Sequence, residues 1–105
     1  MTDTKRITLP DDERAALIAA LARHRLTVTE SEDTGGSIII YPIGHPHITS
    51  IAYWRDAPPE DRWGAEWMVC NPYFWHRSAG EGPTPAAAIE ALLAEIAALA
   101  QDPAP

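Results

Sequence analysis

The residues best suited to metal chemistry in this sequence are its histidines and its single cysteine. His45 and His47 flank Pro46, and Cys70 and His76 follow downstream. Side chains at positions i and i+2 of an extended segment point to the same side, so the two histidines could share a metal with a downstream ligand. The spacing matches no established zinc pattern, and surface histidines on a proline-rich turn explain it more simply. We predict no cofactor and keep His45, His47 and His76 as metal candidates of second rank.

Catalysis by a nucleophile would require Cys70 or Ser78 beside His76. A reactive thiolate needs an electropositive, partly exposed setting, whereas Cys70 lies in an apolar segment and is expected to be a small buried residue. The carboxylate pairs fall at a helix start and on turns, where they stay solvated, whereas a general acid needs burial. Residues 80–84 vaguely resemble a phosphate-binding entry to a helix, but they lack lysine and contain the repelling Glu81. We predict that the protein is not an enzyme.

Aromatic residues offer the strongest indication of binding. All of them except Tyr41 fall between positions 53 and 75, and four are tryptophans. Trp and Tyr are enriched at binding hot spots, and arginine stacks well on aromatic faces. The predicted binding surface consists of Trp54, Arg55, Trp63, Tyr73, Trp75 and Arg77.

The alternative is that these aromatic residues fill the core. We expect Trp67, together with Tyr53 or Trp54, to be core residues. Residues 73–75 are three consecutive aromatics, so strand alternation directs at least one of them toward solvent or a partner.

Two helices are predicted to position these residues. Residues 11–24 follow Pro10 and begin with three acidic residues, which suits a helix start, and they carry apolar residues at helical spacing. The second helix begins at Thr84, a good N-cap, with Pro85 in the first helical position. Its apolar stripe contains Ile89, Leu92, Leu93, Ile96 and Leu99, and the last four could also mark a homodimer seam.

Between the helices the sequence predicts strands at residues 26–30, 37–41, 48–54 and 65–70. Residues 71–77 form either a final strand or an aromatic loop, and 78–83 a glycine-rich connector. Short turns favour antiparallel pairing. The predicted fold is α+β: an antiparallel sheet of three to five strands with an N-terminal and a C-terminal helix packed on one face. We expect a single domain over residues 1–105, with an ordered core at about 8–100 and flexible tails at 1–7 and 101–105.

Composition narrows the classes of function. The chain has 105 residues, one cysteine and a net charge of -7 with a single lysine. It shows no apolar run of membrane-spanning length, no signal-peptide pattern and no disulfide framework, so we expect a cytoplasmic location without membrane contact. The high content of alanine, proline and arginine favours a source with a GC-rich genome, such as an actinobacterium or one of its phages.

Three hypotheses of function follow. The first is a small acidic interaction module, an accessory or inhibitory factor. It would bind an unknown protein through its aromatic and arginine surface or through an acidic face, and the acidic charge favours a basic partner. The second is nucleic-acid binding, because the order of elements is similar to that of the double-stranded RNA-binding domain. That family has a basic cluster at the start of its last helix, whereas residues 81–88 have no positive charge, so nucleic acid is disfavoured. The third is the small His/Cys metal protein.

Overall fold

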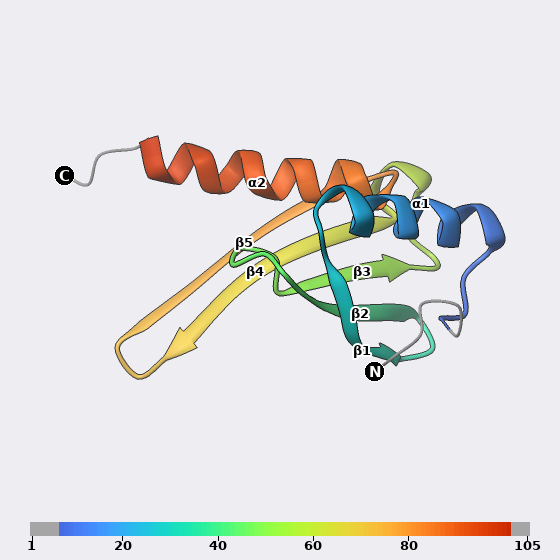
Figure 1. The fold of residues 1–105 in the computed structure, drawn as a ribbon, viewed down its shortest axis with the longest axis horizontal. Coiled ribbons are helices and arrows are strands. Elements are labelled where there is room, and N and C mark those ends of the chain that lie inside the picture. The colour runs from blue at the N-terminus through green and yellow to red at the C-terminus, as the bar shows by residue number, and fades with distance from the viewer. Residues whose placement is uncertain (1–6, 102–105) are drawn as a thin grey trace.

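The computed structural model describes residues 7–101 and shows one sheet with two helices (Figure 1). The elements follow the order α1 (Asp11–Arg23), β1 (Thr27–Asp33), β2 (Ser37–Ile43), β3 (Ser50–Trp54), η2 (Pro59–Asp61), β4 (Trp63–Asn71), β5 (Phe74–Gly82) and α2 (Pro85–Gln101). All strands pair antiparallel with their neighbours in chain order. The predicted α+β fold is confirmed, with five strands.

The core lies between the sheet and the helices. Strand alternation turns Ile38, Ile51 and Trp63 toward the helices, and each is at most 1% exposed. The helices contribute apolar residues from one face to the same cluster, namely Leu17, Ala20, Leu21, Ala88, Ile89 and Leu92. Both helices therefore cover one face of the sheet, and the opposite face carries no element of the described chain.

Helix α2 lies directly on β5 because the strand has almost no side chains there. A Cβ atom at Gly80 would lie 2.3 Å from the backbone nitrogen of Leu92 and 2.6 Å from the carbonyl oxygen of Ala88. The Thr84 hydroxyl accepts a hydrogen bond from the Ala87 N–H at 3.1 Å, which confirms the predicted N-cap. Alanine on the helix and glycine on the strand thus permit a close approach.

Strand β5 is longer than the sequence predicts. Residues 78–83 look like a glycine-rich connector, but the structure continues β5 to Gly82, which pairs with Trp63. Glycine is normally unfavourable in a strand interior. Here it is required by the packing of α2, and that is why the local pattern misleads.

The ends of the ordered region also differ from expectation. Ile7, which the sequence places in a flexible tail, is 3% exposed and belongs to the core. Its carbonyl oxygen accepts hydrogen bonds from the guanidinium of Arg14 on α1. Helix α2 extends to Gln101, while the remaining predicted tail residues, 1–6 and 102–105, lie outside the described residues.

The β4–β5 hairpin extends beyond the other strands (Figure 1). Strand β3 pairs with β4 only as far as Glu66, so residues 67–71 of β4 pair with β5 alone. This two-stranded ribbon contributes to the elongated shape, with extents of 47 × 29 × 26 Å. Within residues 7–101, neither helix has the length and apolar character needed to cross a bilayer.

Candidate functional site

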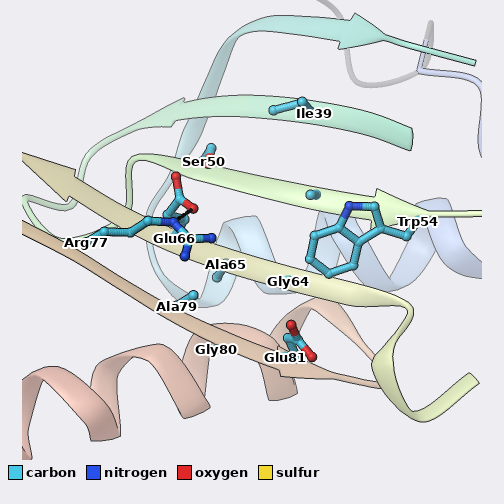
Figure 2. Close-up of a pocket in the computed structure, with 11 residues that line it drawn as sticks. Ile39, Ser50, Trp54, Gly64, Ala65, Glu66, Arg77, Ala79, Gly80 and Glu81 are labelled. Carbon is cyan, nitrogen blue, oxygen red and sulfur yellow. Dashed lines mark hydrogen bonds and ion pairs between the residues drawn. The ribbon is translucent and has the colours of Figure 1, made fainter. Parts of the chain in front are cut away.

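A pocket of about 240 Å³ lies on the open face of the sheet, the face away from both helices (Figure 2). Its floor is made largely of small residues from the three strands β3, β4 and β5. Two larger features bound it: the indole of Trp54 and an ion pair between Glu66 and Arg77. The remaining lining residues are Ile39, Ser50, Ala52, Gly64, Ala65, Ala79, Gly80 and Glu81.

The indole of Trp54 crosses from β3 onto β4 at Gly64. A Cβ atom at Gly64 would lie 2.3 Å from Cη2 and 2.7 Å from Cζ3 of the ring, so any side chain there would displace the indole. Trp54 is half-buried: its six-membered ring rests on the Gly64 backbone, and the ring also lines the pocket. The absence of a side chain at Gly64 thus determines where this aromatic surface lies.

At the other end of the pocket, the guanidinium of Arg77 donates a hydrogen bond to Glu66. Figure 2 shows the arginine side chain reaching from β5 across to β4, where Glu66 is held. The Arg77 side chain is half-exposed and that of Glu66 is largely covered. One cation and one anion therefore neutralise each other here.

Acidic residues surround the rest of this face. Glu81 is paired in register with Gly64, and Glu30 and Glu32 are paired with Tyr41 and Ile39, so strand alternation brings all three carboxylates to the open side. The Tyr41 hydroxyl donates a hydrogen bond to Glu32, and burial followed by the charge of Glu32 raises the pKa of Tyr41. Arg77 is the only basic residue that alternates onto this face of the described strands.

The ribbon continues the same face outward as an apolar surface. Trp75 is 65% exposed and lies opposite Cys70, while Met68 lies opposite Arg77. Tyr73, at the hairpin turn, is 97% exposed. The expected exposure of at least one residue of the aromatic run is confirmed.

Cys70 differs from its expected burial, because its thiol lies on the open face of the ribbon and is exposed. His76 is paired with Val69 and so points to the opposite face of the ribbon. The two predicted partners in thiol or metal chemistry are therefore separated by the backbone of the sheet.

Three predicted binding residues, Trp54, Trp75 and Arg77, share the open face, and Tyr73 extends it. Trp63 does not, because it is 0% exposed and its indole N–H donates a 2.5 Å hydrogen bond to Glu13 of α1. Its placement on a binding surface is wrong: β4 begins at Trp63, two residues before the predicted strand at 65–70, and Trp63 points to the core face. Of the expected core aromatics, Tyr53 is buried and Trp67 packs against the core.

Arg55 joins the β1–β2 turn to the end of β3. Its guanidinium donates to both carboxylate oxygens of Asp33, at 3.0 and 2.9 Å, and to the carbonyl oxygen of Gly35. The hydrogen bond from Arg55, followed by the Gly35 N–H, lowers the pKa of Asp33 from 3.8 to about 2. Arg55 therefore holds two turns together, and three of its five N–H donors are used within the chain.

Two of the histidines, His47 and His76, contact the ring of Trp67 on the helix side of the sheet. The centroids of the His47 and His76 rings each lie 4.8 Å from that of the Trp67 ring. The backbone N–H of His47 donates a hydrogen bond to Nδ1 of His45. Burial, followed by the charges of His47 and His24, lowers the pKa of His45. Across the described residues, no three histidine, cysteine or carboxylate groups are placed to hold a metal ion. His47 and His76 are therefore packed against an aromatic ring.

The predicted homodimer seam on α2 is also altered. Leu92 is completely buried against the sheet, and Leu93 and Ile96 are partly buried against the core, whereas Leu99 is exposed. Leu92 therefore cannot contact a second chain, because its side chain already lies in the monomer core.

Glu81 and Gly64 are the site residues that the sequence analysis missed. Glu81 lies in a segment expected to be a connector, and Gly64 precedes the predicted fourth strand. Extending the alternation of β4 and β5 by a few residues would have placed both on one face.

Comparisons of the chain with protein-family models, curated proteins and solved structures find no significant match.

Proposed function

We propose that this protein is a small interaction module that binds a basic protein partner through the open face of its sheet. The observation that carries the proposal is the composition of that face: an uncovered aromatic and apolar centre surrounded by carboxylates. A buried aromatic anchor with a polar rim is the usual anatomy of a protein-binding site. Trp54 and Trp75 would be the anchors.

The charge of the face supports a basic partner. Among the charged residues that alternate onto this side of the strands, Arg77 is the one basic residue. The acidic ones are Glu30, Glu32, Glu66 and Glu81. The chain as a whole carries a charge of -7. The negative electrostatic potential from these charges accelerates association with a positively charged surface, and it weakens as the salt concentration rises. The sequence suggests separate acidic and aromatic sides, but in the structure Glu30 and Glu32 lie on the same face as Trp54.

Nucleic-acid binding fits this face less well. A phosphate backbone needs clustered lysine and arginine, and here a single arginine is already paired with Glu66. Polarisation titrations with single-stranded and duplex RNA and DNA at low salt are expected to show no binding. Saturable binding that disappears in Trp54→Ala would favour the nucleic-acid alternative over the protein-binding proposal.

The direct test is quantitative capture of partners from source cells with the full chain as bait. Trp54→Ala and Trp75→Ala should each lose the same basic protein, while Ile18→Ala, which removes an exposed side chain from α1, should retain it. Truncating a hot-spot anchor costs about 2 kcal/mol or more, which is roughly a thirtyfold loss of affinity. Urea unfolding of each variant confirms that the baits are folded.

The captured protein is then purified and titrated at increasing salt. We expect its dissociation constant to rise with ionic strength, because complementary charges contribute to binding. Partners that bind both tryptophan variants as well as the wild type would contradict the proposal. Loss of binding in Ile18→Ala alone would move the interface to the helical side.

A further inference from the structure

One end of the open-face pocket has an arrangement suited to a planar cation. The Trp54 ring lies over Gly64 so closely that a Cβ atom there would fall 2.3 and 2.7 Å from ring carbons, and one side of the ring is therefore covered by backbone. The ring also lines the pocket. An aromatic ring that is fixed from behind and open in front presents its negative face at a defined position.

A carboxylate stands next to this ring. Glu81 is the register partner of Gly64, the residue on which the indole rests, and both Trp54 and Glu81 line the same pocket (Figure 2). Glu81 is exposed, and its carboxylate makes no hydrogen bond or ion pair with any residue of the described chain. Its two oxygens are therefore available to an incoming donor.

The opposite end of the pocket shows the same pairing within the chain. There the Arg77 guanidinium reaches across from β5 to the Glu66 carboxylate on β4. Because Glu66 is already paired with Arg77, its carboxylate is not available to a second cation, and Glu81 beside Trp54 is the carboxylate left for one. A guanidinium suits this end better than an ammonium does, because it stacks on an indole while its fork of N–H donors binds a carboxylate.

We propose that Trp54 and Glu81 form a subsite for an arginine side chain of the partner. The inference rests on the proposed function and deepens it by naming the group that is recognised. The guanidinium stacks on the outer face of the Trp54 indole and donates to the Glu81 carboxylate. The apolar stem of the arginine lies over Ala52 and Ala79 on the pocket floor.

The test needs no knowledge of the partner. ¹⁵N-labelled protein is titrated with N-acetyl-arginine amide while the indole N–H signals are followed, and Trp54→Phe identifies the Trp54 signal. We expect this signal to shift saturably at millimolar ligand, and N-acetyl-lysine amide to bind more weakly. Glu81→Gln should weaken the arginine affinity on the order of tenfold, because a charge-assisted hydrogen bond is lost.

Two further variants separate the subsite from general acidity. Glu30→Gln removes one carboxylate from the same face at another strand and should leave the affinity within about twofold. Gly64→Ala forces the indole away from its position and should abolish the shift. Arginine binding that is equal in Glu81→Gln and wild type, or no shift of the Trp54 signal in the wild type, would overturn the inference. If the captured partner is lost in Trp54→Ala but retained in full by Glu81→Gln, the interaction face stands and the arginine subsite does not.

Discussion

Trp63 and Trp54 lie side by side in the sheet but on opposite faces, and their surroundings differ completely. Trp63 pairs in register with Tyr53, the residue before Trp54. Its indole is fully buried under α1, with its N–H bonded to Glu13, whereas the indole of Trp54 rests on Gly64 at an open pocket. The same residue type is therefore part of the covered core in one position and lines an open pocket in the other.

The largest expected effect is on the covered face. Trp63→Ala removes the largest fully buried side chain and its hydrogen bond, which should lower the free energy of unfolding by about 3–5 kcal/mol. Trp54→Ala should lower it by about 1 kcal/mol, because that side chain is already partly exposed. Urea unfolding followed by far-UV circular dichroism measures both. Equal losses of stability in the two variants would break the comparison between the faces.

The two faces of the sheet also differ in what a glycine on them contacts: Gly80 lies against the backbone of α2, and Gly64 lies against the Trp54 ring. Gly80→Ala would put a methyl group against the α2 backbone, where neither Leu92 nor Ala88 can give way without moving the helix. We expect a loss of about 2–3 kcal/mol. The added methyl group of Gly64→Ala contacts only the far end of the Trp54 side chain, which can rotate away. The loss in the free energy of unfolding should therefore be about 1 kcal/mol.

Thermal unfolding of the two alanine variants provides the measurement, and the ranking is the result that matters. A Gly64→Ala variant less stable than Gly80→Ala would show that the Trp54 ring contributes more to folding than the contact between α2 and β5. Binding of N-acetyl-arginine amide separates them further. Gly80→Ala, if folded, should retain the Trp54 signal shift that Gly64→Ala loses.

The elements of the fold could be predicted because their local patterns are strong. The acidic start of α1, the Thr84–Pro85 start of α2 and the alternation in β4 each indicate the correct element without tertiary information. The end of β5 could not be predicted, because Gly80 and Gly82 serve the packing of a helix against the sheet, which no local pattern reveals. Burial against α2 outweighs the low strand propensity of glycine.

The site could be predicted only in part, because some of its residues depend on distant contacts. Trp54, Trp75 and Arg77 follow from the abundance of aromatic residues and their arginine neighbours. The burial of Trp63 depends on α1, about fifty positions away, and sequence patterning therefore misplaces it. The ion pair between Arg55 and Asp33 could not be predicted either, because it forms only when two turns meet in space.

A smaller effect is expected from the contact that fixes Trp63. Glu13→Ala leaves the buried indole N–H without its acceptor, which should cost roughly 1–2 kcal/mol. Glu13→Gln retains an acceptor oxygen and should cost less. Chemical denaturation of both variants, beside Asp12→Ala as an exposed neighbour on the same helix, gives the comparison. If the alanine and glutamine variants at position 13 are equally stable, the hydrogen bond does not contribute to the covered face.

The smallest expected change in folding stability comes from the ion pair between Asp33 and Arg55, which holds two turns together at the end of the sheet. The pKa of Asp33 is lowered to about 2 in the folded protein from an ordinary 3.8, so the unfolded chain takes up a proton more readily than the folded one. The stability from this pair is therefore complete above pH 3.8 and is lost as the pH falls toward about 2. Asp33→Asn lacks that contribution at every pH. Urea midpoints should show the wild type more stable than Asp33→Asn at about pH 6, with the difference shrinking as the pH falls from about 4 to about 2. A difference independent of pH would mean that the substituted side chain disturbs the turn by its shape rather than by its charge.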